Sequence, residues 1–243
     1  EDIIKVDATL SQEEVAYTMN KYDLIVLPVV NDKGQLLGRI TGDDVMDVMK
    51  EEAEKDYQMA SGISEDVESS DSVWEITRAR LPWLLIGMVG GLFGAKVIGI
   101  FDIEKNYEMA FFIPLIAAMG GNVGVQSAAI VVQSLASGTT SLGNISQRLI
   151  KELGVALVNG IICSTIILCS SYLLGYGFDL SLTVSIALLS VIIFAALFGT
   201  FIPLTLNKYK IDPALATGPF ITTVNDVLGL FIYFLIGQLI LSI

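Results

Sequence analysis

Five long apolar runs occupy most of the sequence after residue 80, and they restrict the chain to folds that cross a lipid bilayer. The hydrocarbon core of a bilayer is about 30 Å thick, so a helix needs roughly 20 apolar residues to span it. The five predicted spans are residues 81–101, 109–136, 153–175, 181–206 and 214–242. Because 53% of the residues are hydrophobic and only 16% are charged, we expect a mostly α-helical integral membrane protein with a smaller polar part.

Acidic charge is concentrated in the polar part that precedes the first span. Residues 1–80 hold 19 of the 26 Asp and Glu residues but only 8 of the 14 Lys and Arg residues. A strongly acidic segment disfavours nucleic acid as a partner and favours cations. The sequence also lacks histidine, the commonest general base and the usual ligand of zinc and other transition metals. The chain opens at Glu1 without an initiator Met, so we expect it to be part of a longer protein.

Basic residues flank alternate ends of the predicted spans. They are Arg78 and Arg80 before the first span, Arg148 and Lys151 between the second and third, and Lys208 and Lys210 between the fourth and fifth. Loops rich in Lys and Arg stay on the cytoplasmic side of a membrane. We therefore expect a multi-pass protein of the plasma (inner) membrane, with its N-terminus in the cytoplasm and its C-terminus outside.

Asp226 is the only charged residue after Ala214, and it lies near the middle of the last span. An ionised carboxylate at that depth costs about 2.5–3.5 kcal/mol, so it must face a cavity or a partner. Two structural alternatives are a protonated carboxyl that packs between helices and an ion pair with Lys96. Pro219 is expected to free a backbone carbonyl, and neighbouring glycines permit close approach of backbones. Carbonyls beside a carboxylate suit a hard cation, which is the favoured partner.

The second span is unusual because glycine and amide residues lie at its centre. They are Gly120, Gly121, Asn122, Gly124 and Gln126. Polar or broken helix at this depth is tolerated only where protein or water covers it. Tight helix packing is one explanation. Beside a carboxylate in the middle of the membrane, the pattern also predicts a pore, with Gly121, Asn122 and Asn225 as candidate lining residues.

Residues 3–50 predict a small cytoplasmic α/β unit. Its elements are a helix from a Ser11–Glu14 capping box to about Asn20, a buried strand over 24–30, a turn at 31–34, a second strand over 36–40, and a helix from Val45. The run from Leu27-Pro-Val-Val to Leu37-Gly-Arg-Ile-Thr-Gly-Asp-Asp-Val resembles a CBS motif. CBS motifs normally work in pairs, and this sequence holds one. Many such pairs bind adenosine nucleotides through a Thr-x-x-Asp element, which Thr41, Asp43 and Asp44 match.

An acidic connecting helix and a linker, residues 44–80, separate the CBS motif of residues 1–43 from the membrane domain of residues 81–243. Asp44, Asp47, Glu51 and Glu54 recur every three or four residues, so their carboxylates share one helix face. This face is either an acidic surface exposed to solvent or a binding surface on which a divalent cation relieves the repulsion between the carboxylates.

The order of these parts resembles that of the MgtE magnesium channels, as do Gly-Gly-Asn-Val-Gly-Val-Gln at 120–126 and Asp-Pro-Ala-Leu-Ala-Thr-Gly-Pro-Phe-Ile-Thr-Thr-Val-Asn-Asp at 212–226. The resemblance implies a homodimer with a pore on its twofold axis. It implies that Asp226 holds the permeating ion near the backbone carbonyl of Thr222, with Asp212 at the cytoplasmic mouth. The implied regulatory magnesium sites, in the CBS motif and the plug helix, use Glu13, Asp23, Asp44, Asp47, Glu52 and Asp56. One expected carboxylate is replaced by Lys55, and the family's N domain and first CBS motif are absent from this sequence.

The expected function is a magnesium-selective channel that moves Mg²⁺ into the cytoplasm and closes when cytosolic Mg²⁺ binds the acidic residues. ATP is a further expected ligand of the full-length protein. Within transport, the alternative is a secondary exchanger of divalent cations that uses Asp226. A membrane-anchored magnesium or nucleotide sensor would need only one span. An intramembrane aspartyl protease would need two acids that share a proton, whereas one mid-span Asp is present, so no enzyme is expected.

Overall fold

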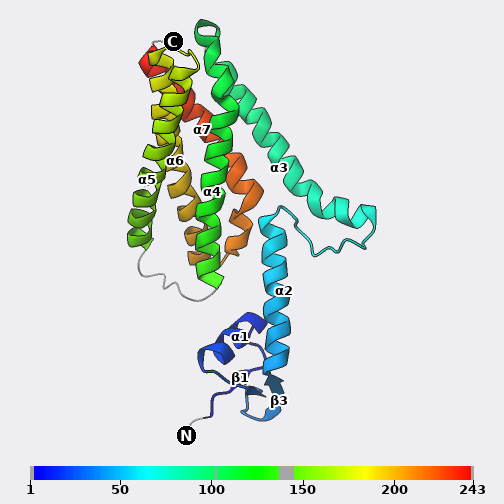
Figure 1. Ribbon diagram of the computed structural model, residues 1–243. Coiled ribbons are helices and arrows are strands. Elements are labelled where there is room, and N and C mark those ends of the chain that lie inside the picture. Colours follow the sequence, from blue (N-terminus) through cyan, green and yellow to red (C-terminus); the bar gives the residue numbers. More distant parts are fainter. Residues whose placement is uncertain (1–2, 102, 137–144, 242–243) are drawn as a thin grey trace. The chain divides into compact units, whose positions relative to one another are not determined.

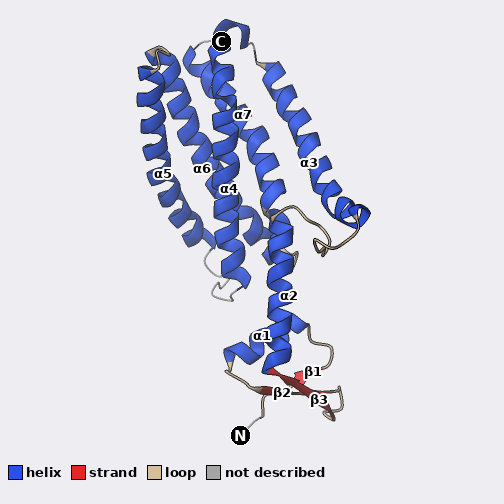
Figure 2. Ribbon diagram, turned by 45° about the vertical axis from the view of Figure 1, so that its right-hand side comes forward, coloured by secondary structure: helices blue, strands red, loops and turns tan. Residues whose placement is uncertain are grey.

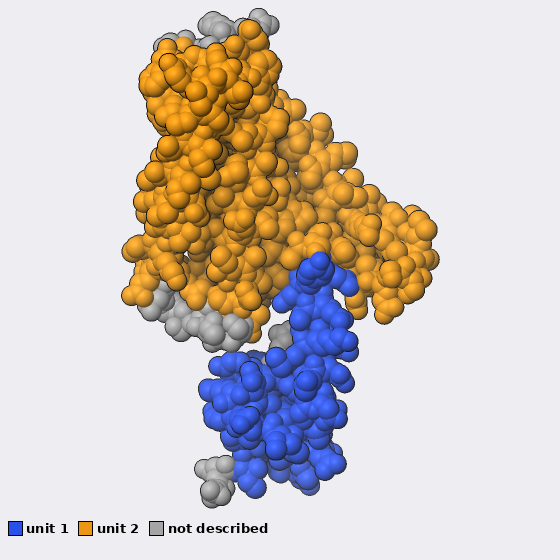
Figure 3. Space-filling view, in the orientation of Figure 1, with its two compact units in different colours: residues 1–58 blue, residues 59–243 orange. Residues whose placement is uncertain are grey.

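The computed structural model of the chain describes residues 3–101, 103–136 and 145–241. The chain divides into two compact units, residues 1–58 and residues 59–243 (Figure 3). Among the described residues, strands occur only in the first unit, and the second unit is built from helices (Figure 2). The predicted fold, mostly helical with a small α/β part, is confirmed.

The first unit is a three-stranded sheet with a helix packed on it. Its elements are β1 (Val6–Asp7), α1 (Gln12–Lys21), β2 (Val26–Val30) and β3 (Leu36–Thr41), with β1 parallel and β3 antiparallel to the central β2. As predicted, Ser11 caps α1, because its Oγ accepts a hydrogen bond from the Glu14 N–H at 3.2 Å. Leu27 on β2 and Met19 on α1 are the most buried residues of the small core between them. The sequence did not indicate β1, since two residues are too few to show strand alternation.

The acidic helix α2 (Gly42–Ala60) follows β3 directly and starts three residues before the predicted Val45. Beyond its end, Gly62 has a φ of +80°, which turns the chain into the segment before the membrane helices. That segment is held by Ser64, whose Oγ donates to the Ala79 carbonyl at 2.8 Å. Although it was predicted as a loose linker, it is therefore partly tied to the first membrane helix.

Five of the described helices are long and apolar enough to cross a membrane (Figure 1). They are α3 (Val73–Ile100), α4 (Ile113–Ala136) with the preceding 3₁₀ helix η1 (Ile103–Phe112), α5 (Ile145–Leu173), α6 (Phe178–Lys208) and α7 (Gly218–Leu241). The predicted number of helices capable of spanning a membrane, five, is confirmed. The first helix starts well before residue 81, because Ser72 and Glu75 form a full capping box at its N-terminus.

Helix α6 is the centre of the helical unit. It packs against α4, α5 and α7, and it contributes Val184, Leu188 and Val191 to the hydrophobic core. Figures 1 and 2 show α3 and α5 on the two outer sides, with α4, α6 and α7 between them. A buried hydrogen bond from Ser185 Oγ to the Ser164 carbonyl, at 2.8 Å, joins α6 to α5. Helices α4 and α7 thus both pack on the central helix.

The end of α7 farthest from Gly218 is fastened to the segment before α4. The buried Tyr233 hydroxyl donates to the Met109 carbonyl at 2.9 Å. Phe234 stacks on Phe101 at the end of α3, with ring centroids 5.5 Å apart. Phe112 meets Tyr176 edge to face at 5.1 Å. Aromatic contacts and one long-range hydrogen bond thus join three helices at this end of the unit.

Candidate functional site

The last predicted span is divided into two helices. A short 3₁₀ helix, η3 (Pro213–Ala216), is capped by Asp212, which is exposed and whose Oδ1 accepts from the Ala214 N–H at 2.9 Å. Gly218 then has a φ of +48° and begins α7. Pro219 consequently lies in the first turn of α7, where its missing N–H has no helical partner. The expectation that it frees a carbonyl inside the span is therefore wrong.

Asp226 lies about 12 Å along α7, at the ninth residue, and is half-buried. Its carboxylate faces α4 at Gly121: a Cβ added to this glycine would lie 3.4 Å from Asp226 Oδ1 and 3.1 Å from Thr222 Cγ2. Thr222 stands one turn before Asp226 on the same face, and its hydroxyl donates to the Gly218 carbonyl at 3.0 Å. Gly121 therefore leaves room for both side chains beside α4.

Neither of the structural alternatives for Asp226 provides it with a partner. Within the described ranges, Asp226 makes no hydrogen bond or ion pair, whereas buried or half-buried carboxylates normally have one. Lys96 is exposed on α3 and makes no ion pair with it. The carboxylate is thus available to an ion.

Asn225, the residue before Asp226, faces the interior of the helix bundle. It is 1% exposed, and neither Asn225 Nδ2 nor Asn225 Oδ1 has a hydrogen-bond partner in the described part of the chain. Its amide fills the space that a Cβ on Gly124 would need, and its backbone lies near Gly120. Asn225 therefore packs between α7 and α4 inside the helix bundle, and it lies on a different face of α7 from Asp226.

Helix α4 carries an exposed polar stripe next to Gly121. Asn122, Gln126 and Gln133 are exposed and lie at helical spacing on one face. Side-chain amides facing lipid are costly, because hydrocarbon offers them no hydrogen-bond partner. This stripe must therefore meet water or another protein surface, and Asp226 lies at its edge.

Glu152 is a polar residue of the helical unit that the sequence analysis did not single out. Its Oε1 accepts a hydrogen bond from the buried Ser127 Oγ at 2.6 Å, which joins α5 to α4. One turn earlier on α5, Arg148 Nη1 donates to Ser134 Oγ of α4 at 2.9 Å. Glu152 directly precedes the predicted third span, and its sequence position alone does not indicate this contact.

The predicted nucleotide element serves as a helix cap. Asp44 Oδ2 accepts from the Thr41 hydroxyl at 2.7 Å and from the Thr41 N–H at 2.8 Å. These two hydrogen bonds hold the pKa of Asp44 below its ordinary value. Asp43 is exposed beside them. The Thr41 N–H and hydroxyl are thus both engaged with Asp44.

The predicted regulatory carboxylates do not converge within one chain. No group of three or more acidic side chains gathers around a common point in the portions that the structure covers. Asp23 and Asp47 are exposed, and Glu52 pairs with Lys55 at 3.6 Å. Asp56 is partly buried and has a partner, and Glu13 lies on α1 with a side chain outside the described residues. Regulatory sites at these positions would need ligands from a further surface.

Comparison with known proteins connects both parts of the chain to established families. A family model described as MgtE, divalent cation transporter, matches residues 113–236, and the CBS domain model matches residues 1–51. The chain is 35% identical to the magnesium transporter MgtE of Bacillus subtilis, over 96% of this chain and 52% of that protein. It is 34% identical to the MgtE proteins of Thermus thermophilus and Enterococcus faecalis, over 99% and 98% of this chain and 54% and 53% of theirs.

The matched segments contain the features that the fold brings together. The MgtE match covers α4, α5, α6 and most of α7, including the polar stripe, Gly121 and Asp226. The chain spans about half the length of the curated relatives that it matches. Since the family model covers half of the chain and the relatives align along nearly all of it, this chain belongs to the MgtE family of divalent cation transporters.

Proposed function

We propose that this chain forms the permeation path of a magnesium-selective channel that admits Mg²⁺ to the cytoplasm down its electrochemical gradient. The observation that carries the proposal is Asp226, a carboxylate inside a membrane span that makes no hydrogen bond or ion pair in the described residues. A buried charge without a partner is costly, so a cation is the natural counter-charge. The names of the relatives, magnesium transporters, support Mg²⁺ as that cation.

The chemistry of Mg²⁺ fits a site with few protein ligands. Mg²⁺ requires octahedral oxygen coordination and gives up its water reluctantly, so it is bound by one or two carboxylates together with retained waters. Asp226 and the Thr222 carbonyl, on adjacent turns of α7, would supply oxygen ligands. Two Asp226 carboxylates, one from each copy of a homodimer, would attract a divalent ion, whereas the small number of direct ligands would let the ion leave again.

A homodimer accounts for the polar stripe of α4. The exposed amides of Asn122 and Gln126 need a surrounding other than lipid, and the stripe borders the Asp226 carboxylate. Two copies related by a twofold axis along this face would enclose a polar path with an Asp226 from each copy. In this arrangement Gly121 and Asn122 line the path, and Asn225 packs between α4 and α7 on the side away from the path.

Gating is proposed to reside in the CBS motif and α2. The spacing of Asp44, Asp47 and Glu51 on one face of α2 makes the helix repel other acidic surfaces. Cytosolic Mg²⁺ bridging α2 to a second acidic surface, with Asp56 and Asp23 among the ligands, would relieve this repulsion and close the channel. The positively charged flanks support a cytoplasmic location for this part. Thr41, Asp43 and Asp44 would bind ATP only after the cap of α2 is released.

Magnesium uptake into proteoliposomes loaded with a Mg²⁺-sensitive dye tests the proposal. Asp226→Asn keeps the side-chain shape and removes the charge, and it should abolish Mg²⁺ uptake while leaving the thermal unfolding midpoint unchanged. Asp179→Asn is the matched control, because Asp179 is an exposed carboxylate in the first turn of α6 and should not affect uptake. Undiminished uptake in Asp226→Asn would refute the site. Single-channel currents would in addition exclude an exchanger.

A further inference from the structure

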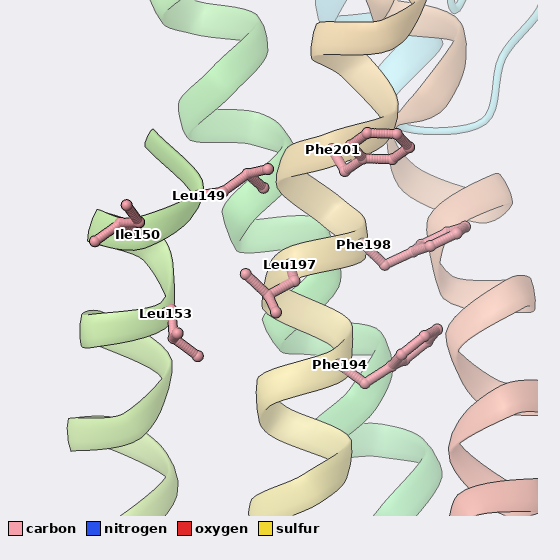
Figure 4. A pocket seen from close by; sticks show the side chains of 7 residues that line it. All are labelled: Leu149, Ile150, Leu153, Phe194, Leu197, Phe198 and Phe201. Carbon is pink, nitrogen blue, oxygen red and sulfur yellow. The ribbon is translucent and has the colours of Figure 1, made fainter. Parts of the chain in front are cut away.

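An entirely apolar groove lies between α5 and α6, apart from the proposed ion path. It has a volume of about 480 Å³ and is lined by seven apolar side chains, among them Leu149, Ile150 and Leu153 of α5. Figure 4 shows Phe194, Phe198 and Phe201 one after another along α6, and the rings of Phe194 and Phe198 stack with centroids 5.6 Å apart. Both helices are membrane spans, so the groove opens at membrane depth.

The aromatic stripe of α6 continues to a lysine. Phe194, Phe198, Phe201, Thr205 and Lys208 follow one another at spacings of three and four residues, so they lie on one face of the helix. Lys208 is exposed and makes no ion pair in the described part of the chain. The Thr205 hydroxyl donates to the Phe201 carbonyl at 2.8 Å and is thereby satisfied. The stripe is consequently apolar along its length and positively charged at its end.

The dimensions of this stripe correspond to one leaflet of a bilayer. Fourteen residues separate Phe194 from Lys208, which is a rise of about 21 Å. Half of a bilayer with its headgroups is roughly 20–22 Å thick. If Lys208 lies at the headgroup level, Phe194 lies near the bilayer centre. We propose that this groove binds one acyl chain of an anionic phospholipid, whose phosphate pairs with Lys208.

Charge supports an anionic phospholipid as the occupant. At the groove end where α6 finishes, Arg148 and Lys151 begin α5 and Lys208 ends α6, whereas the opposite end of α6 carries Asp179. Lysine near the membrane surface attracts anionic headgroups by about 1 kcal/mol each. A zwitterionic headgroup gains less, because its own cation opposes the attraction.

Two other occupants fit the groove less well. A polar small molecule needs a few fixed polar groups, and the lining residues supply none. A second copy of this chain would cover the polar stripe of α4 and not this groove, because the amides of the stripe cannot face lipid. This step rests on the proposed dimer. An acyl chain needs only apolar contact, which is all that the groove offers.

Native mass spectrometry of the detergent-solubilised chain tests the site, using palmitoyl-oleoyl phosphatidylglycerol and palmitoyl-oleoyl phosphatidylcholine as probes. The chain should retain phosphatidylglycerol at least about fivefold more strongly than phosphatidylcholine, and Lys208→Gln should lower this preference about fivefold. Lys210→Gln is the matched control, because Lys210 is also exposed but lies beyond the end of α6. It should keep the preference.

The groove itself is tested by filling it. Ile150 is 69% exposed, so Ile150→Trp fills the groove without disturbing the core, and it should weaken retention of both lipids by about tenfold. Val158→Trp, at a position of α5 that is 60% exposed and does not line the groove, should have no effect. Equal retention of the two lipids by the unaltered chain, or full retention by Ile150→Trp, would overturn the proposal. Loss of dimers in Ile150→Trp would also overturn it, since the groove would then be a protein interface; none of these results bears on Asp226.

Discussion

Gly124 shows how closely the helices around Asp226 approach one another. A Cβ at this position would overlap Asn225 Nδ2 and lie 2.8 Å from Ile221 Cγ2 on α7. The Gly124 carbonyl also occupies the place of a Cβ on Gly199 of α6. Three helices therefore meet at backbone distance here, which only residues without a side chain allow.

Gly124→Ala should consequently lower the free energy of unfolding by about 1–3 kcal/mol, because the added methyl group overpacks the contact. Gly154→Ala is the control: Gly154 lies on α5 with nothing within 4 Å of the added Cβ. It should stabilise the helix by about 0.5–1 kcal/mol. Thermal unfolding in detergent micelles measures both, and equal shifts would contradict the close contact.

The hydrogen bonds to Asp44 predict a pH dependence of the CBS unit. The Thr41 hydroxyl and, less strongly, the Thr41 N–H lower the pKa of Asp44 in the folded state. A lowered folded-state pKa means that the stabilisation is complete above the ordinary pKa and is lost as the pH falls through the lowered one. Asp44→Ala should therefore destabilise the chain at pH 7, and the difference from the unaltered protein should disappear well below about pH 4.

Circular dichroism during thermal unfolding at several pH values measures this difference. Asp43→Ala is the matched control, because Asp43 is the neighbouring exposed carboxylate and makes no hydrogen bond in the described residues. Its effect should be small at every pH. A difference for Asp44→Ala that persists undiminished in acid would show that the cap does not depend on the charge.

At the scale of elements, residues 60–62 of the second compact unit meet the start of α7 through two glycines with positive φ. A Cβ on Gly62 would lie 2.5 Å from Pro219 Cγ, and a Cβ on Gly218 would overlap the Ala60 carbonyl. Both glycines are therefore needed for conformation and for space. The contact fastens the residues that follow the acidic helix to the first turn of the helix that carries Asp226.

Gly62→Ala should destabilise this contact by more than the cost of its backbone conformation alone. Gly175→Ala supplies that reference, because Gly175 has a φ of +94° but nothing within 4 Å of an added Cβ. Alanine at positive φ costs about 1 kcal/mol, so Gly175→Ala should lose this amount and Gly62→Ala clearly more. Hydrogen exchange of the first turn of α7 should rise only in Gly62→Ala; a rise in both would point to a general loss of stability.

Element types were predictable from the sequence, whereas several boundaries were not. The five spans follow from apolar length, and the α1 cap follows from a local Ser11 and Glu14 pattern. The start of α3 at Val73 depends on the capping box of Ser72 and Glu75. The first turns of this helix are charged, so the apolar run alone does not reveal where the helix begins. The division of the last span depends on the backbone conformation of Gly218, which an apolar run does not reveal.

The candidate site was predictable only in part, for a similar reason. Asp226 could be identified from the sequence, because a lone carboxylate in an apolar span is energetically costly. The adjacent Asn225 points about 100° away around the helix, and only the position of α4 decides that it is buried. Glu152 shows the same limit, since its role depends on Ser127 of another helix.

At the scale of the whole molecule, the polar stripe of α4 predicts which surface two copies share. In a background with Cys163→Ala and Cys169→Ala, Asn122→Cys should form a disulfide-linked dimer on mild oxidation, because Asn122 is exposed on the stripe. Val158→Cys, exposed on α5, is the control and should remain monomeric on a denaturing gel. Equal cross-linking of the two variants would place the dimer axis elsewhere.

The hydrogen bond between Tyr233 and the Met109 carbonyl fixes one point of α7, about which the helix would turn if its contacts near Gly218 and Asn225 were released. Along α7, Gly218 lies about 22 Å from Tyr233 and Asp226 about 10 Å. A rotation of α7 about Tyr233 would therefore move Asp226 roughly half as far as Gly218. A small displacement of Asp226 would thus accompany a larger one at the start of the helix. If the proposed channel gates in this way, an antibody fragment that binds only near Tyr233 should bind its open and closed states with equal affinity.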